Sequence, residues 1–371
     1  MKLIVCSGLP ISRLFGEKID AWWFGNNGFD VEFWDLAPLF YPVEKLKGFY
    51  SGDPNYCYFG PAHRVVSSYD ELLDVARANS GALVWYLSRF DRMIQDDAVI
   101  ALFNQHGIAY IFQHFDPHDS CGSWSDYVKW PYREMREWWF SRRCNPRAVV
   151  TSGTLGRSQV KARYPKAQVI SVPSVKVLWA EKGLASGGDY AVFVDESVGF
   201  EPDLQILGNV SCTDVNGYYK RMRDLFCVVE DSLQVPVKVA CSEKYRYPDP
   251  EGSFGHRDIV YGETFRLIQG CEMAFGHLSL ALDQAVISRK PVVLVDDISF
   301  SAWRRKFFRD VVSRFRQQPV LNTKINKILI EKALVRNLAF YETVEAKYFR
   351  EPAVREEYRR ICADAFRMIA A

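Results

Sequence analysis

The first half of the chain alternates short, continuously apolar runs with longer segments whose apolar residues recur at helical spacing. The apolar runs, each bounded by turn residues, predict buried strands over residues 3–6, 31–34, 64–67, 82–87, 108–112, 148–151 and 168–172. The helical spacing predicts helices over residues 69–79 and 92–106. Strands that are apolar throughout and separated by helices are typical of a parallel sheet covered on both faces.

A stretch rich in glycine and serine, residues 181–189, interrupts this alternation and predicts a linker. Beyond it, strands are predicted over 190–194, 237–240, 258–260, 273–275 and 292–295, and helices over 214–233, 263–271 and 278–288. From about residue 325 the pattern is helical. We therefore predict an α/β protein with a first domain over 1–182, a second over 189–335, and helices over 336–371 that pack back on the first domain.

The composition fits two globular domains and excludes a nucleic-acid-binding protein of the usual kind. Of 371 residues, 48% are hydrophobic and 25% charged, close to the globular average. The net charge is only +2, whereas proteins that hold nucleic acid through its phosphates are usually more basic. The aromatic fraction of 15% is high. Most rings fall in predicted strands and helix faces, and a few in strand-end loops are candidates for stacking: Phe115, Trp124, Trp130, Tyr245, Tyr247 and Tyr261.

We expect a cytoplasmic protein. The apolar run at the start is too short for a secretory signal, and no stretch approaches the roughly 18 apolar residues of a membrane span. The nine cysteines are scattered singly without a C-x-x-C pair, which is typical of reduced thiols and makes structural zinc improbable. Aromatic and basic residues in 340–371 and in 304–308 leave open an alternative, a peripheral contact with the membrane surface.

Ligands bind open α/β sheets outside the carboxyl ends of the strands, so the residues after each strand are the first candidates for chemistry. Asp195 and Glu196 directly follow the predicted strand 190–194. Two acids in that position can supply a general base, a nucleophile or a metal ligand. The alternative is that one carboxylate caps a turn while the other is solvated.

Three further strand ends carry groups that suit a nucleotide. Hydroxyl, charged and aromatic side chains follow the predicted strand 237–240. After the next strand, Gly262, Glu263 and Thr264 open a helix whose free amides suit an anion. A histidine and a serine lie beside the start of another helix. The candidate residues for nucleotide binding are Ser242, Glu243, Lys244, Gly262, Glu263, Thr264, His277 and Ser279. The alternatives are ordinary surface charges, a plain turn and a structural histidine.

In the first half, His114 and Asp116 follow the predicted strand 108–112. Alternating histidine and aspartate suggests a metal, but ligation by His114 and His118 needs a helix that Pro117 disfavours. The other interpretation is a catalytic loop or one that faces an acceptor substrate.

The order and spacing of several motifs resemble a family of bacterial surface-carbohydrate and capsule biosynthesis proteins, glycosyltransferases of the GT-B type related to Kdo and sialic-acid transferases. The resemblance covers about residues 169–297, a third of the chain. It rests on Val172-Pro173-Ser174, Val194-Asp195-Glu196, Pro202-Asp203, Tyr218 with its helix, Val237 to Ala240, Phe254 to Arg257, Gly262-Glu263-Thr264, His277-Leu278-Ser279 and Lys290-Pro291.

The resemblance implies two Rossmann-like domains facing a cleft, with His277, Ser279 and Thr264 lining the donor nucleotide site of the second domain. It also implies a CMP-linked 2-keto acid sugar as donor. This chain has Ser242-Glu243 where those families often carry His-Pro. UDP and GDP donors therefore stay open.

Together these features predict a glycosyltransferase that moves a sugar from a nucleotide-sugar donor to a growing glycan or lipid-linked glycan. Asp195 or Glu196 is the expected catalytic carboxylate, with Asp116 or His114 as the competitor. Helix starts and hydroxyls would stabilise the leaving phosphate, so no cofactor and no metal are expected. The alternatives are a nucleotide-sugar epimerase or hydrolase on the same scaffold, and a non-catalytic scaffold of polysaccharide assembly.

Overall fold

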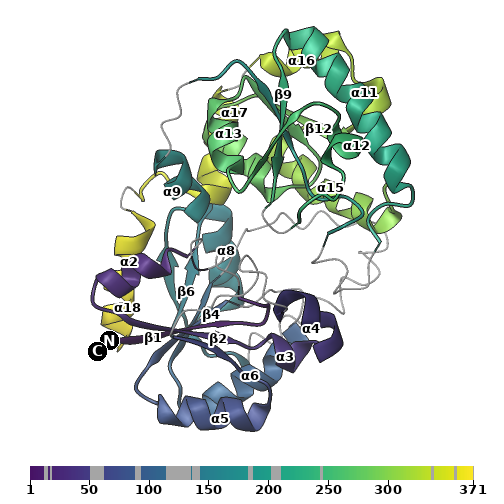
Figure 1. The fold of residues 1–371 in the computed structure, drawn as a ribbon. Helices are drawn as coiled ribbons and strands as arrows, with labels where there is room; N and C mark the ends of the chain where they lie inside the picture. The colour runs from purple at the N-terminus through teal and green to yellow at the C-terminus, as the bar shows by residue number, and fades with distance from the viewer. Residues whose placement is uncertain are drawn as a thin grey trace. The chain divides into compact units, whose positions relative to one another are not determined.

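The computed structural model describes residues 1–11, 16, 19–50, 62–87, 93–113, 135, 143–182, 187–201, 210–242, 245–335, 338–354 and 357–370. These residues form two compact units (Figure 1). Unit 1 holds the described residues up to Val175 and again from Ala346 onward, and unit 2 holds those of Lys176–Glu345. Each unit is built on its own parallel sheet.

The sheet of unit 1 has seven parallel strands in the order β3-β2-β1-β4-β5-β6-β7. They are β1 (Lys2–Ser7), β2 (Asp30–Asp35), β3 (His63–Val65), β4 (Leu83–Leu87), β5 (Tyr110–Gln113), β6 (Ala148–Thr151) and β7 (Gln168–Ser171). The strands predicted from apolar runs are confirmed, with ends that move by one or two residues.

Both faces of this sheet are buried, because successive side chains along a strand point to opposite faces. Trp85 of β4 lies in one core with α2 (Ala21–Asn26), and its neighbour Tyr86 lies in the other with α5 (Tyr69–Ala78) and α6 (Met93–Gln105). The second core also contains α8 (Gly153–Arg163). Further helices of unit 1 are α3 (Ala37–Phe40) and α4 (Val43–Tyr50). Helix α9 (Val175–Lys182) begins at Val175 of unit 1 and continues into unit 2.

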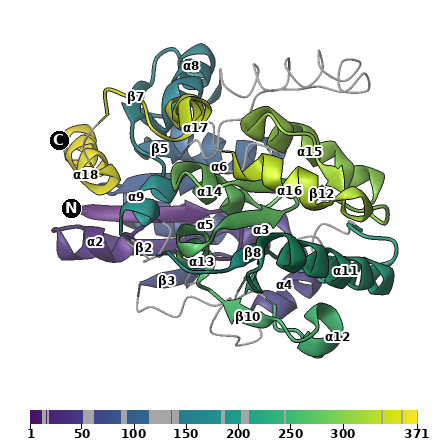
Figure 2. The same cartoon turned by 90° about the horizontal axis from the view of Figure 1, so that it is seen from above.

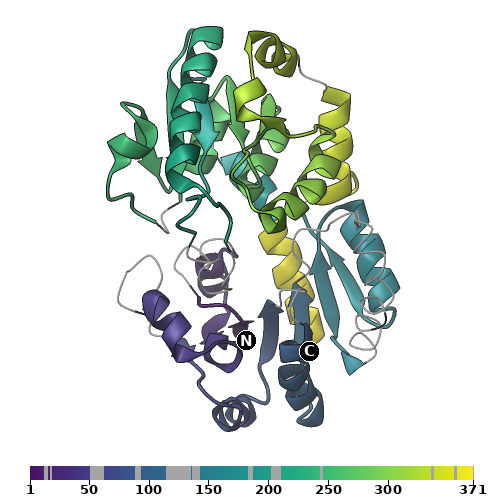
Figure 3. The ribbon, with the colours of Figure 1, turned by 90° about the vertical axis from the view of Figure 1, so that its right-hand side faces the viewer.

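The last helix, α18 (Tyr358–Ala370), belongs to unit 1 although it ends the chain; it is yellow in Figure 3. Phe366 stacks on Phe24 of α2 with ring centroids 5.8 Å apart and meets Trp85 edge-on at 5.1 Å. The Arg147 guanidinium donates to the carbonyl of Ile369 at 2.9 Å. The helix is therefore an integral part of the first core.

The sheet of unit 2 has six parallel strands in the order β10-β9-β8-β11-β12-β13. They are β8 (Ala191–Val194), β9 (Val237–Cys241), β10 (Asp258–Tyr261), β11 (Met273–Gly276), β12 (Val292–Asp296) and β13 (Val320–Leu321). The first five were predicted. The two-residue β13 is too short to give a pattern in the sequence.

Helices cover this second sheet, and α16 packs beside α11 (Figure 1, Figure 2). The helices are α11 (Val215–Leu233), α12 (Pro250–Phe254), α13 (Thr264–Gly270), α14 (Asp283–Ile287), α15 (Ala302–Phe315), α16 (Lys327–Leu334) and α17 (Leu338–Val344). Short turns add η2 (Leu280–Leu282), η3 (Asn322–Lys324) and the π-helix η4 (Glu345–Phe349), within which the chain passes from unit 2 to unit 1.

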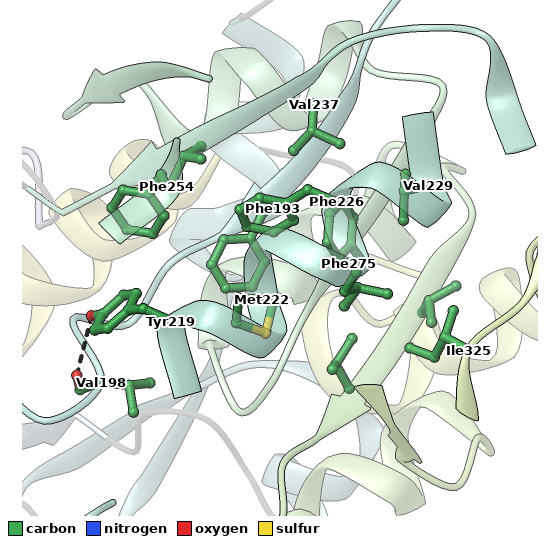
Figure 4. Close-up of a cluster of buried hydrophobic side chains, with 14 of the residues drawn as sticks. Phe193, Val198, Tyr219, Met222, Phe226, Val229, Val237, Phe254, Phe275 and Ile325 are labelled. Carbon is green, nitrogen blue, oxygen red and sulfur yellow. Dashed lines mark hydrogen bonds between the residues drawn. The ribbon is translucent and has the colours of Figure 1, made fainter. Parts of the chain in front are cut away.

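The longest described helix, α11, starts and buries its face as its sequence predicts. The Asp214 side chain caps it by accepting a hydrogen bond from the amide of Gly217 at 2.9 Å. Met222 and Phe226 pack against Phe193 of β8 and Phe275 of β11 in the core of unit 2 (Figure 4). This core fixes the strands whose ends carry the candidate site.

One local prediction was wrong, and a second overlaps the end of a helix. The segment 278–288 is not one helix: Ser279 caps the short turn η2 by accepting from the amide of Ala281, and α14 begins only at Asp283. The expected linker 181–189 begins inside α9, which runs to Lys182. Of the expected linker, residues 183–186 lie outside the described part of the chain. In the described helices, none has the length and apolar character needed to cross a membrane.

Candidate functional site

The register of the second sheet brings the predicted site segments to one edge. Val194 pairs with Ala240 on one side and with Gly276 on the other, and Tyr261 pairs with Cys241. The segments that follow β8, β9, β10 and β11 therefore leave the sheet at the same carboxyl edge. These segments contain Asp195, Glu196, Ser242, Gly262, Glu263, Thr264, His277 and Ser279. Glu243, Lys244, His114 and Asp116 lie outside the described residues.

Asp195 is buried at this edge with one oxygen satisfied and the other unused. Its Oδ2 accepts hydrogen bonds from the hydroxyl of Tyr247 at 2.8 Å and the amide of Ser197 at 3.1 Å, and the thiol of Cys241 lies 3.5 Å away. Among the described residues, Oδ1 has no hydrogen-bond partner. A buried carboxylate oxygen without a donor is uncommon in native proteins, and a catalytic role is one of its recognised causes.

The loop that carries Asp195 is held in an unusual backbone conformation. Ser197 has a φ of 55° and Gly199 a φ of 87°, so both lie in the left-handed region. A side chain at position 199 would collide with Val215, whose Cγ2 would be 2.5 Å away. Strained backbone of this kind persists where the surroundings fix it, and it is concentrated at functional sites.

The burial of Asp195 raises the pKa of its carboxyl to about 6, although hydrogen bonds from Tyr247, Ser197 and Cys241 oppose the shift. Burial favours the neutral form because a charged carboxylate loses its hydration, and donors to the ionised form offset part of that loss. Asp195 therefore titrates close to neutrality, where a general base is most effective.

A stability prediction follows from this raised pKa. Asp195 favours the folded state while it is protonated, below its unfolded pKa of about 4, and this contribution is lost as the pH rises through about 6. Asp195→Asn is a neutral isostere. Above pH 6 its free energy of unfolding, measured with denaturant, is therefore expected to exceed that of the wild type by up to about 3 kcal/mol. Below about pH 4 the difference should vanish. Equal stability at every pH would contradict the burial of a charged Asp195.

Glu196 differs from its neighbour because both of its oxygens are engaged. Oε1 accepts from the amide of Leu278 at 2.6 Å, and Oε2 forms an ion pair with Arg304 of α15. Arg304 is 3% exposed and also bonds Glu201 at 2.8 Å. Burial raises the pKa of Glu196, although the positive charge of Arg304 acts to lower it. The pKa of Arg304 is raised by the two glutamates, although burial acts to lower it. These three groups form a buried ionic cluster that fixes the loops after β8 and β11.

His277 is fully buried, and both of its ring nitrogens have partners inside unit 2. Nδ1 lies 2.7 Å from the carbonyl of Val295, so Nδ1 carries the proton, and Nε2 accepts from the hydroxyl of Tyr218 at 2.8 Å. Burial, with Arg304 nearby, lowers the pKa of His277 to about 3. The imidazole is therefore neutral, and in this conformation it presents no free nitrogen to a nucleotide.

The other predicted donor-site residues have simpler surroundings. The Gly262 amide donates to the carbonyl of Cys241 at 3.1 Å, and its φ of 77° favours glycine. Glu263 is exposed and paired with Arg266, and Thr264 is half-buried at the first position of α13. Ser242 is half-buried directly after β9, and the hydroxyl of Ser279 caps η2.

Three residues of the site were not predicted as such from the sequence. Tyr247 was expected to stack on a ligand but is only 6% exposed and bonds Asp195 instead. Arg304 was placed in a membrane-surface segment with Phe308, and both are buried in unit 2. Asp297, directly after β12, accepts two hydrogen bonds of 2.8 and 2.9 Å from the guanidinium of Arg221 in α11. These bonds and those from Ser299 lower the pKa of Asp297 to about 2, although its burial works to raise it. The only sequence feature that pointed to Asp297 was its position just after a predicted strand.

No known protein-family model matches this chain, and no curated protein is similar to it in sequence. Solved structures do share its fold. The UDP-GlcNAc 2-epimerase from Methanocaldococcus jannaschii matches with a TM-score of 0.53 and 9% identity, over 99% of this chain and 100% of the other. The glycosyltransferase SnogD from Streptomyces nogalater matches with a TM-score of 0.53 and 12% identity, over 100% and 99%.

A third match is UGT2 from Phytolacca americana, complexed with UDP-2-fluoro-glucose and pterostilbene, with a TM-score of 0.52, 9% identity and full coverage of both chains. The chain has the GT-B fold. Its two parallel-sheet, Rossmann-like domains are those expected from the sequence.

Proposed function

We propose that this GT-B protein is a glycosyltransferase that moves a sugar from a nucleotide-activated donor to a glycan acceptor. The observation that carries the proposal is Asp195, a buried carboxylate with one unused oxygen at the carboxyl edge of the second sheet. The fold supports the substrate class. Among the matched structures, SnogD is named a glycosyltransferase, UGT2 holds a UDP-sugar analogue, and the epimerase is named for UDP-GlcNAc.

Sugar transfer asks the protein for two things: a base for the acceptor hydroxyl and stabilisation of the departing phosphate. In this proposal Oδ1 of Asp195 takes the hydroxyl proton while the acceptor oxygen bonds to the anomeric carbon. The bond from that carbon to the phosphate oxygen breaks, and the nucleotide leaves with the electron pair. Asp116 and His114 remain the competing candidates for the base.

For the phosphate, we propose contacts from the hydroxyls and amides that gather at the same edge. Ser242, Thr264 and Ser279 offer hydroxyls there, and Gly262 lets the backbone come close. Lys244 stays a proposed contact. His277 acts indirectly in this proposal, because its bond to the carbonyl of Val295 holds the end of β11 against β12.

We further propose a surface glycan, such as a capsule or O-antigen, as the product, made on the cytoplasmic side of the membrane. A CMP-linked sugar such as Kdo or a sialic-acid-like sugar is the proposed donor, with UDP and GDP sugars as alternatives. Calorimetric titration with CMP, UDP and GDP separates these. Binding of one base alone supports the proposal, and binding of none favours a non-catalytic scaffold.

Transfer is expected to continue in excess EDTA, because the proposal assigns charge stabilisation to amides and hydroxyls and to no metal ion. Among the described residues, no three His, Cys, Asp or Glu side chains are grouped to hold one. The initial rate should be measured with EDTA, with added Mg²⁺ and with Mn²⁺. Loss of activity in EDTA that divalent metal restores would overturn this part of the proposal.

A nucleotide-sugar 2-epimerase is the second candidate, because the epimerase structure matches this fold with the same TM-score of 0.53 as the transferase SnogD. The two functions differ in their need for an acceptor. Incubation with the nucleotide sugar alone, followed by analysis of the products, tells them apart. Fast conversion without acceptor favours the epimerase, and turnover that depends on the acceptor favours the transferase.

A further inference from the structure

We propose that Tyr247 is a positioning residue that holds Asp195 in its ionised, proton-accepting state through Oδ2 and leaves the buried Oδ1 without a bond to the described residues. This inference rests on the proposed role of Asp195 and names the group that makes that role workable. The resemblance to GT-B glycosyltransferases gives no role to Tyr247.

The ring of Tyr247 is held from several sides, so its hydroxyl has a fixed direction. Phe254 lies edge-on to it at 4.8 Å between ring centroids, Tyr245 at 4.9 Å and Tyr219 at 5.9 Å. From this position the Tyr247 hydroxyl reaches Oδ2 of Asp195 at 2.8 Å. The pair joins segments 52 residues apart in the sequence.

The hydroxyl of Tyr247 is also part of a short buried chain of donors and acceptors. It lies 2.9 Å from the hydroxyl of Tyr219. The Tyr219 hydroxyl in turn donates to the carbonyl of Val198 at 3.1 Å, the bond drawn as a dashed line in Figure 4. When Asp195 is ionised, Tyr247 donates to Oδ2. When Asp195 takes a proton on Oδ1, Oδ2 remains an acceptor and Tyr247 keeps the same bond to it.

Tyr247 therefore donates to Oδ2 in both protonation states of Asp195, while Oδ1 gains and loses the proton. This leaves Oδ1 as the atom that exchanges a proton with a substrate hydroxyl. A residue that gains and loses a proton in each catalytic cycle needs such an arrangement, because an unpaired buried polar group is costly in either state.

The groups around Asp195 make Tyr247 the main support of its negative charge. From its own loop Glu196 adds a second negative charge, and Tyr218 and Tyr219 of α11 face it. From the segment around β9, Tyr245, Tyr247 and Cys241 face it. The cation Arg304 of α15 is bound to Glu196 and Glu201. The Cys241 thiol is a weak donor at 3.5 Å. Of the remaining groups that lower the pKa of Asp195, the Tyr247 hydroxyl has a larger effect than the amides of Ser197 and Glu196.

The test compares Tyr247→Phe with wild type by carboxyl-carbon NMR titration, with the Asp195 signal assigned from its loss in Asp195→Asn. Tyr247→Phe keeps the ring and removes the donor, so the Asp195 titration should move up by about one pH unit. Tyr219→Phe keeps the bond to Asp195 and should move it less. Tyr190→Phe is the matched control: it removes a hydroxyl that donates to the carbonyl of Leu267 at the other end of β8 and should leave the titration in place.

The acid limb of the kcat/KM profile for transfer is measured on the same proteins. The proposal expects it to move up together with the NMR titration. An Asp195 titration that stays in place in Tyr247→Phe overturns the positioning role. A titration that moves while the activity profile stays in place retains the contact but overturns Asp195 as the base, which is a failure of the proposed function rather than of the tyrosine's effect on Asp195.

Discussion

Asp195→Asn is expected to lower the rate of sugar transfer by roughly 10²–10⁴-fold, the usual contribution of a general base. Asparagine keeps the shape and can still accept the bond from Tyr247 at its amide oxygen, but it cannot take a proton. The measurement is kcat/KM for transfer near the optimal pH, with circular dichroism to confirm that the variant is folded.

Two controls make this result specific. Asp258→Asn makes the same change at an exposed position at the start of β10, where Lys238 is 3.8 Å away, and should leave the rate unchanged. Glu196→Gln changes the neighbouring carboxylate, which the structure already pairs with Arg304 and the amide of Leu278. Near-normal transfer in Asp195→Asn contradicts the assignment and leaves Asp116 or His114 as the base.

Arg304→Met is expected to lower the free energy of unfolding by about 3–5 kcal/mol, because it leaves Glu196 and Glu201 as buried charges without a partner. The arginine side chain is 4% exposed and the two glutamates are 14% and 13% exposed, so water cannot replace the lost cation fully. Methionine fills similar volume, which separates the loss of charge from the loss of packing. Denaturant unfolding at neutral pH gives the difference.

The matched control is Arg266→Met, which breaks the pair with Glu263 at the surface and should change stability by less than about 1 kcal/mol. A second comparison removes the stranded charges: Glu196→Gln and Glu201→Gln in the Arg304→Met background should recover part of the loss. An effect of Arg304→Met no larger than that of the control would show that the cluster is not a buried ionic one.

The strands and the edge on which the candidate residues gather were predictable from the sequence. Continuous apolar runs mark strands that are buried on both faces. Because the strands are parallel, their carboxyl ends all lie at one edge of the sheet. This reasoning placed Asp195, Glu196 and His277 together, as the register of β8, β9 and β11 does. It needed only local pattern and topology.

The choice between Asp195 and Glu196 could not be made from the sequence, because their partners lie far along the chain. Arg304, 108 residues after Glu196, occupies that carboxylate, and Tyr247, 52 residues after Asp195, binds only one oxygen of the other. The order of the residues carries no sign of these pairings. The same distance effect hid the buried role of Arg304, whose neighbouring cations and rings suggested a membrane surface instead.

The most direct test of the central claim is mass spectrometry of a glycan acceptor incubated with CMP-, UDP- and GDP-activated sugars. The acceptor should gain the mass of one sugar with donors of one base, the free nucleotide should be released in equal amount, and Asp195→Asn should slow both by roughly 10²–10⁴-fold. Conversion of a nucleotide sugar at the same rate without acceptor, with no mass gain on any glycan offered, would contradict the claim that this protein is a glycosyltransferase.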